Sequence, residues 1–126
     1  MFELYFYQDR RGKEPVWDHL QEMKRKSEQD KSSRIQFNKL NDYLQALSEY
    51  GFAAGEPYVK HLEGEIWELR PLRNRILFAA WSRNGFVLLH MFVKTTQKTP
   101  HREIEQAKRN LADFIERSNK NEARKC

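Results

Sequence analysis

Hydrophobic positions in the first thirty residues of the chain follow two periods in turn. Residues 2–8 (FELYFYQ) carry many aromatic side chains, which is typical of a strand. From Glu14-Pro15 onward the apolar residues recur at helical spacing, and proline is tolerated in the first turn of a helix because its missing N–H costs nothing there. The pattern predicts a strand over 2–8 and a helix from Pro15 to about residue 28, with the inward side chains Val16, Leu20 and Met23.

A second helical stripe follows the first and ends at a glycine. It begins at about Ser32 or Ser33, and Gly51 just past its end is a natural helix terminator. Residues 51–57 hold two glycines and a proline, so they are predicted to form a loop. The inward positions of this helix are expected to be Ile35, Phe37, Leu40, Tyr43, Leu44 and Leu47.

From residue 58 the period changes from helical to strand-like. Residues 58–61 form a short extended piece, and strands are predicted over 65–70, 75–83 and 86–94. Between the last two strands, Asn84-Gly85 is a strong signal for a type I′ hairpin turn, in which both central residues need positive φ.

A basic loop and a third helix complete the pattern. Residues 94–100 (KTTQKTP) indicate a loop, and a helix is predicted to open at Pro100 or His101, with Ile104, Ala107, Leu111 and Phe114 facing inward. Residues 119–126 are polar and are expected to be a frayed tail. The predicted order is β-α-α-β-β-β-α, a single α+β domain over residues 1–126 with an antiparallel sheet packed on helices.

The predicted turns determine which side chains lie opposite each other in the sheet. The two-residue hairpin turn opposes Arg75 and Lys94, and a four-residue loop over 71–74 opposes Arg70 and Arg75. One face of the sheet would then carry a row of three cations. The other face is almost wholly apolar, so the helices are expected to cover it and to leave the row on an open, wetter face; its members are Trp67, Leu69, Ile76, Phe78, Ala80, Leu89, Met91 and Val93.

Three like charges side by side destabilise a sheet unless something neutralises them. Glu68 points to the same face as Arg70 and is expected to offset part of the charge. An anion such as phosphate among the cations would explain the rest, and Lys98 adds a further cation in a loop without acidic residues. The alternative is that each cation at a strand end is an ordinary solvated edge residue. For the whole row, we favour an anion site.

Net charge and composition narrow the choice of partners. The 126-residue chain has a formal net charge of +5, and residues 58–109 carry twice as many basic as acidic side chains, whereas residues 1–57 are nearly balanced. A local basic surplus is typical of proteins that bind nucleic acid or another polyanion. No apolar run approaches the roughly 18 residues of a membrane span, and residues 1–11 do not have the pattern of a signal peptide. We therefore expect a soluble cytoplasmic protein.

Neither a metal site nor a cofactor is expected. Cys126 is the only cysteine, and the chain has no HExxH motif or clustered histidine and aspartate ligands. Among the histidines, His19 is expected at the surface and His90 as a packed, hydrogen-bonded side chain of a strand. His61 and His101, which opens the last helix, remain candidate proton carriers.

Several segments occur in the order found in a known toxin family: KHL at 60–62, EIWELRPLRNRILF at 65–78, FVLLHMFVKTTQKTP at 86–100 and EIEQA at 103–107. Over about residues 58–110 the chain resembles the phage-derived Gp49-like branch of the RelE/HigB toxins. The resemblance implies a RelE-like fold and a type II toxin that enters the ribosomal A site and cleaves messenger RNA there. It also implies a cognate HigA-type helix-turn-helix antitoxin, through which operator DNA would be contacted.

The resemblance also implies the catalytic residues. Catalysis in the family relies on basic residues at the end of the ELR strand and around the loop after the last strand, which are here Arg70, Lys94 and Lys98. Arg75 matches a frequent sheet arginine with a catalytic or a more structural role. Relatives often supply an acid or base from a C-terminal tyrosine or histidine, and this chain has no tyrosine after Tyr58.

Further contacts to RNA or to the ribosome would come from Lys60, Arg73, His61 and His101. The general acid stays open among the two histidines and the lysines.

RNA cleavage without a metal would use the 2′-hydroxyl as the nucleophile. Arg70 and Arg75 would clamp the phosphate, because arginine stays protonated and binds phosphate bidentately. Lys94 or Lys98, with a pKa lowered by cationic neighbours, would move protons. Two other functions stay open: a ParE-like inhibitor that cuts nothing, and a noncatalytic RNA-binding module.

Overall fold

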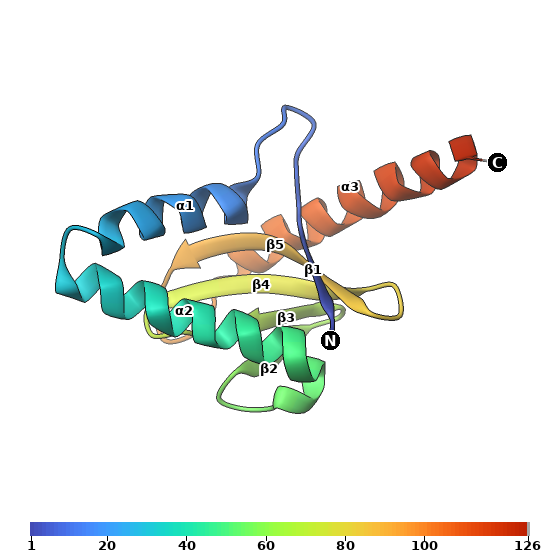
Figure 1. Ribbon diagram of the computed structural model, residues 1–126. Coiled ribbons are helices and arrows are strands. Elements are labelled where there is room, and N and C mark those ends of the chain that lie inside the picture. Colours follow the sequence, from blue (N-terminus) through green and yellow to red (C-terminus); the bar gives the residue numbers. More distant parts are fainter. Residues whose placement is uncertain (126) are drawn as a thin grey trace.

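A computed structural model describes the backbone of residues 1–125 and the side chains of residues 1–119. Two helices lie on one face of a five-stranded sheet, and a third, long helix crosses the other face (Figure 1). The elements in chain order are β1 (Glu3–Phe6), α1 (Pro15–Ser27), α2 (Lys31–Tyr50), the short 3₁₀ helix η1 (Gly51–Ala54), β2 (Val59–Glu63), β3 (Ile66–Leu69), β4 (Asn74–Trp81), β5 (Gly85–Val93) and α3 (His101–Lys125).

The α+β class predicted from the sequence is confirmed, whereas the purely antiparallel sheet is wrong. The strand order is β1-β5-β4-β3-β2, with β1 parallel to β5 and every other neighbouring pair antiparallel. The short extended piece at 58–61 is part of a full strand, β2, which forms the edge opposite β1. A frayed tail was expected over residues 119–126; the backbone of α3 continues to Lys125, and the side chains of residues 120–126 lie outside the described residues.

Local sequence signals account for the ends of the first two helices. Pro15 stands in the first turn of α1, and the Asp30 side chain caps α2 by accepting a hydrogen bond from the Ser33 N–H at 2.7 Å. Gly51 ends α2 with a positive φ, as expected of a glycine terminator. The inward position predicted for Ile35 is wrong, because this side chain is 51% exposed.

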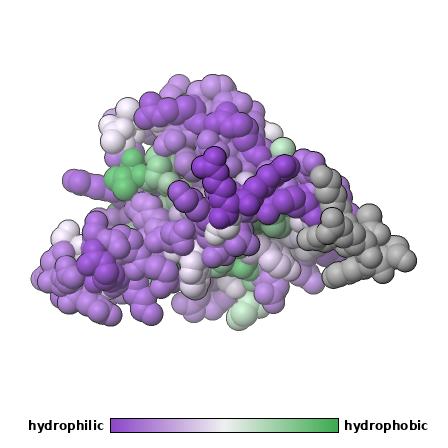
Figure 2. Space-filling model, turned by 90° about the horizontal axis from the view of Figure 1, so that it is seen from above, coloured by the Kyte–Doolittle hydropathy of each residue, from purple (hydrophilic) through white to green (hydrophobic). Residues whose placement is uncertain are grey.

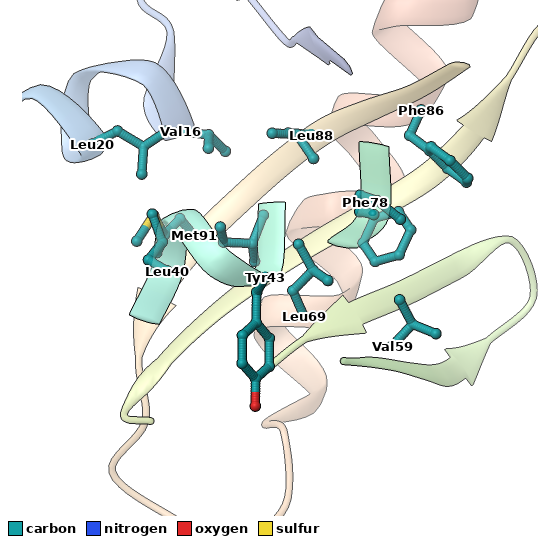
Figure 3. Close-up of a cluster of buried hydrophobic side chains, with 12 residues drawn as sticks. Val16, Leu20, Leu40, Tyr43, Val59, Leu69, Phe78, Phe86, Leu88 and Met91 are labelled. Atoms are coloured by element: carbon teal, nitrogen blue, oxygen red, sulfur yellow. The ribbon is translucent and has the colours of Figure 1, made fainter. Parts of the chain in front are cut away.

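One hydrophobic core lies between the sheet and the pair α1 and α2 (Figure 3). It contains Val16, Leu20, Leu40, Tyr43, Leu47, Val59, Leu69, Ile76, Phe78, Phe86, Leu88 and Met91. Burial of aliphatic and aromatic side chains of this size contributes roughly 1.5–3 kcal/mol per residue. This core therefore supplies much of the free energy that holds α1 and α2 on the sheet.

A second core lies on the face that the sequence predicted to be open. Side chains of α3 pack there against the sheet, and the buried members are Tyr7, Ile66, Leu77, Ala79, Val87, Leu89, Ala107 and Leu111. The prediction of an open, wetter face is wrong because the apolar stripe of α3 needs a surface to cover and this face provides it. Trp81 lies under the same helix, with its ring centroid 4.9 Å from that of Phe114.

The hairpin between β4 and β5 differs from the predicted type I′ turn. Trp81 pairs with Gly85, so three residues form the turn, and Ser82 rather than Asn84 has the positive φ. Gly85 serves another purpose, because a Cβ there would lie only 2.8 Å from the Tyr5 ring. The longer turn moves the register of the whole hairpin.

A β-bulge changes the register again further along β5. Leu77 pairs with His90 and Phe78 pairs with Leu88, so Leu89 is an extra residue whose side chain faces α3. Its carbonyl accepts a hydrogen bond from the Asn110 side chain at 2.8 Å. The placement of Leu89 on the face of α1 and α2 is therefore wrong.

The combined shift separates two members of the predicted cation row. Arg75 lies opposite Phe92, whereas the Lys94 N–H donates to the carbonyl of Arg73 at 2.7 Å. The predicted pairing of Arg75 with Lys94 is wrong because the turn and the bulge together displace β5 by two positions. Two further expected core positions, Ala80 and Val93, are exposed.

The later turns of α3 are hydrogen-bonded to the segment that follows β1. The Tyr7 hydroxyl donates to Asp113 at 2.7 Å, and Arg10 and Arg117 each donate to the same carboxylate at 2.9 Å. Burial is the main cause that raises the pKa of Tyr7 to about 12. This network holds α3 across the sheet.

The surface seen in Figure 2 is mostly hydrophilic, with small and separate hydrophobic patches. Isolated exposed apolar residues are normal on a globular protein. Within the described residues, the helices are too short or too polar to cross a membrane.

Candidate anion-binding site

Three cations of the strand ends line one small cavity. Arg70 directly follows β3, Arg75 lies in β4, and the pairing of Leu69 with Ile76 brings the two arginines together across the turn at 71–74. Lys60 of the edge strand β2 completes the set. The cavity has a volume of about 230 Å³ and is lined by Tyr43, Glu56, Pro57, Lys60, Arg70 and Arg75.

Arg75 is held rigidly at this site. Its side chain is only 5% exposed, and its Nη1 donates to the carbonyls of Leu72 at 2.8 Å and Asn74 at 2.7 Å. Burial lowers the pKa of Arg75, and the nearby carboxylate of Glu68 opposes that effect. Arg75 thus fixes the turn between β3 and β4 while its charge stays beside the cavity.

Glu68 lies beneath the arginine pair as a buried carboxylate. Its side-chain oxygen Oε1 is 3.4 Å from Nε of Arg70, and Oε2 accepts a hydrogen bond from the hydroxyl of Thr99. The sequence indicated that Glu68 shares a face with Arg70, and the ion-pair distance agrees. The link to Thr99 was not predicted, because it depends on how the loop at 94–100 folds back on the sheet.

Lys94 and Lys98 do not line this cavity. Lys94 is half-buried where β5 ends, and Lys98 is exposed in the following loop, where its carbonyl accepts a hydrogen bond from Thr96 at 2.7 Å. The predicted row of three cations is therefore replaced by Arg70 and Arg75 with Lys60, and the two loop lysines stand apart from it.

Arg73 belongs to a different hollow of the surface. It is exposed and lines a groove of about 590 Å³ between the first two helices and the sheet. The groove holds a second basic side chain and no carboxylate; its lining is His19, Met23, Lys26, Ser32, Ser33, Gln36, Arg73, Asn74 and Val93. This composition suits an anionic or hydrogen-bonding ligand better than an apolar one.

The two candidate proton-carrying histidines have partners outside the cavity. His61 contacts the carbonyl of Gly64 at 2.8 Å, and its ring lies 4.9 Å from that of Trp67. His101 is 3.3 Å from Glu105, within the first turns of α3. Neither histidine lines the cavity of the two arginines.

Of the other two histidines, His90 agrees with its predicted placement and His19 does not. His90 is half-buried and contacts Glu103 at 3.1 Å, as expected for a packed, hydrogen-bonded residue. His19 is half-buried rather than fully at the surface, and burial lowers its pKa.

Tyr43 and Glu56 are the cavity residues that the sequence did not identify. The Tyr43 ring packs in the core, while its hydroxyl points away from the surrounding apolar side chains (Figure 3). Glu56 follows η1 and is exposed. A signal existed for Tyr43: it is the one hydroxyl-bearing residue among the inward positions of α2, and a buried tyrosine usually places its hydroxyl near a partner.

Together these groups can bind an oxyanion and offer it proton carriers. Two guanidinium groups and an ammonium group supply positive charge, a phenol can donate a proton, and a carboxylate can accept one. Among the described side chains, no three histidine, cysteine, aspartate or glutamate residues gather as a metal site would need.

Comparison with known proteins gives one family match. The model of the family described as "Phage derived protein Gp49-like (DUF891)" matches residues 22–112, which include α2, all of β2 to β5 and the first half of α3. No curated protein matches the chain.

Proposed function

The chain belongs to the Gp49-like family of phage-derived proteins, and from this premise we propose that it is the toxin of a type II toxin–antitoxin system that cleaves messenger RNA on the ribosome. The observation that carries the proposal is the cavity in which Arg70, Arg75 and Lys60 meet a phenol and a carboxylate.

The two arginines are proposed to hold the scissile phosphate. Guanidinium groups bind phosphate bidentately and keep their charge at neutral pH. A cavity of about 230 Å³ is smaller than the usual pocket for a whole small molecule, so it suits one phosphodiester unit of a longer chain. Because Arg75 is already fixed by two backbone carbonyls, it costs little entropy to place its charge near the phosphorus.

In the proposed reaction the 2′-oxygen of a ribose attacks the adjacent phosphorus. The bond from phosphorus to the 5′-oxygen breaks, which leaves a 2′,3′-cyclic phosphate and a 5′-hydroxyl. Glu56 takes the proton of the 2′-hydroxyl, and Tyr43 or Lys60 gives a proton to the departing 5′-oxygen. The arginines stabilise the negative charge that grows on the phosphate oxygens.

The loop lysines are proposed to act on RNA that is already bound. Lys98 is exposed and Lys94 half-buried beside the basic loop, so they can contact the backbone next to the scissile phosphate or exchange protons with it. Arg73 and Lys26 would extend the same path into the larger groove. His61 and His101, at the strand edge and at the start of α3, are proposed as outer contacts to ribosomal or messenger RNA.

The proposed partners rest on the resemblance of the chain to the RelE/HigB toxins. We propose a HigA-type helix-turn-helix antitoxin that neutralises the toxin and carries the pair to operator DNA, with the ribosomal A site in the cytoplasm as the place of action. The basic surplus of residues 58–109 supports a polyanionic target.

The role of Arg70 is tested by measuring growth arrest in cells that express the Arg70→Ala variant. A substitution of another arginine serves as the control. Arg70→Ala is expected to abolish growth inhibition while the antitoxin still co-purifies, and circular dichroism checks that the variant is folded, since Arg70 also pairs with the buried Glu68. Arg83→Ala removes an exposed arginine of the β4–β5 turn and is expected to keep full toxicity. Unchanged toxicity of Arg70→Ala would contradict the proposed site, and would favour an inhibitor that cuts nothing.

A further inference from the structure

Glu68 is the buried carboxylate of the described part of the chain, with 1% of its surface exposed. Charged side chains are rarely buried unless they are paired, because removing a charge from water is costly. The partners of the Glu68 carboxylate therefore indicate its role.

The carboxylate joins two parts of the proposed site that are far apart in sequence. Oε1 faces Nε of Arg70 at 3.4 Å, and Oε2 accepts the hydrogen bond of Thr99. Thr99 is the last residue but one before α3, at the far end of the loop that carries Lys94 and Lys98. One side chain thus connects the sheet arginine with the basic loop.

The orientation of Arg70 leaves its terminal nitrogens available for a ligand. Glu68 lies against Nε, which is buried and has no hydrogen bond of good geometry, although the oxygen is within ion-pair distance. Within residues 1–119, no hydrogen bond from the two terminal nitrogens of Arg70 is found. Those nitrogens form the edge of the guanidinium that binds phosphate bidentately.

We propose that Glu68 is a positioning residue that couples the basic loop to Arg70, so that loop and arginine act as one phosphate-binding unit. The inference rests on the proposed function for its effect on turnover. In this arrangement Glu68 orients the two terminal nitrogens of Arg70 toward the cavity. The hydrogen bond from Thr99 makes the position of Glu68 depend on the position of the loop. Loss of the Thr99 hydroxyl frees the loop and loosens Arg70 without removing any group that touches RNA.

A purely structural carboxylate would behave differently. If Glu68 only neutralised buried charge, removal of the Thr99 hydroxyl would change the melting temperature of the protein but would leave the environment of Arg70 and the turnover of the folded protein unaltered. The two roles can therefore be separated by a readout at Arg70 itself.

The test compares Thr99→Val, Thr99→Ser and Thr95→Val in the full-length protein. Valine has the shape of threonine without its hydroxyl, serine restores the hydroxyl, and Thr95 is an exposed threonine of the same loop. The measurements are the Nε–H resonance of Arg70 in ¹H–¹⁵N spectra, the amide hydrogen exchange of residues 95–98, and the turnover of messenger RNA on translating ribosomes.

Thr99→Val is expected to shift the Arg70 resonance, to speed loop exchange, and to lower turnover by roughly tenfold, the effect of one hydrogen bond to a charged group. Thr99→Ser and Thr95→Val are expected to resemble the unaltered protein in all three. An unchanged Arg70 resonance in Thr99→Val overturns the coupling. If the unaltered protein cuts no RNA, the proposed function fails, and the resonance and exchange data still decide the coupling.

Discussion

The two ends of the Tyr43 side chain lie in different environments. Its ring packs between α2 and the sheet, and its hydroxyl reaches the cavity of Arg70 and Arg75. The ring makes an edge contact with Tyr58, whose centroid lies 4.9 Å away. A side chain of this kind can be changed at its polar end without disturbing the apolar end. The roles of packing and of chemistry are therefore separable at this position.

Tyr43→Phe is expected to lower the turnover of RNA cleavage at least tenfold, because a general acid contributes roughly 10²–10⁴-fold to a rate. The melting temperature is expected to change little, since the ring and its neighbours remain. Tyr58→Phe is the control, because Tyr58 packs beside Tyr43 but does not line the cavity. Equal turnover of the two variants would remove Tyr43 from the mechanism.

At the scale of residues, the sequence predicted part of the candidate site. Arg70 and Arg75 were identified from strand pairing and a charge surplus, which are visible in the chain itself, whereas Lys60 was named only through the resemblance to the toxin family. Tyr43 and Glu56 were missed because they reach the cavity only through the packing of α2 and of the loop after η1. The hydrophobic periodicity of a segment does not show which distant segment it will contact.

At the scale of elements, helices were easier to predict than strand register. Pro15 and Gly51 predicted the start of α1 and the end of α2, whereas α2 begins at Lys31, slightly before the predicted Ser32 or Ser33, because the Asp30 side chain caps it. The register of β4 and β5 depends on a turn and on a bulge whose carbonyl is held by Asn110 of α3. That contact is tertiary, so the Asn-Gly signal alone led to the wrong pairing.

The observed turn between β4 and β5 and the type I′ turn predict different effects of glycine substitutions on the free energy of unfolding. Ser82 has a φ of 58°, a conformation that costs a residue with a Cβ roughly 1 kcal/mol and costs glycine little. Ser82→Gly is therefore expected to raise the free energy of unfolding by up to about 1 kcal/mol. Asn84→Gly is expected to lower it slightly, because Asn84 does not have positive φ. Chemical denaturation measures both, and the reverse order of the two variants would contradict this turn.

At the scale of the whole molecule, α3 decides which surface is open. The sequence predicted the helix and its apolar stripe, but not that it covers the second face of the sheet. A single sheet has two faces that helices can cover. Only the tertiary packing of the helices on the sheet shows which helix covers which face. The candidate site consequently lies at the strand ends beside α2, and not on an open sheet surface.

The attachment of α3 is expected to depend on pH. The hydrogen bond from Tyr7 is the main cause that lowers the pKa of Asp113, and Arg10 and Arg117 act in the same direction. The stabilising contribution is therefore complete above about pH 4, the unfolded value, and is lost as the pH falls below it. Asp113→Asn should melt below the unaltered protein at pH 7, and the difference should shrink toward pH 3.

Asp42→Asn serves as the control for that pH series, because Asp42 is an exposed carboxylate of α2. Melting curves recorded by circular dichroism at several pH values suffice. A constant difference between Asp113→Asn and the unaltered protein across the series would show that the carboxylate charge does not hold α3.

Cleavage of messenger RNA by the purified protein tests the central claim most directly. Primer extension on a defined message, with and without translating ribosomes, maps each cut, and enzymatic end analysis identifies the termini. We predict cuts that require ribosomes, that leave a 2′,3′-cyclic phosphate and a 5′-hydroxyl, and that disappear with Arg70→Ala but persist with Arg83→Ala. Intact message on translating ribosomes, or equal cutting by Arg70→Ala, would contradict the proposed function.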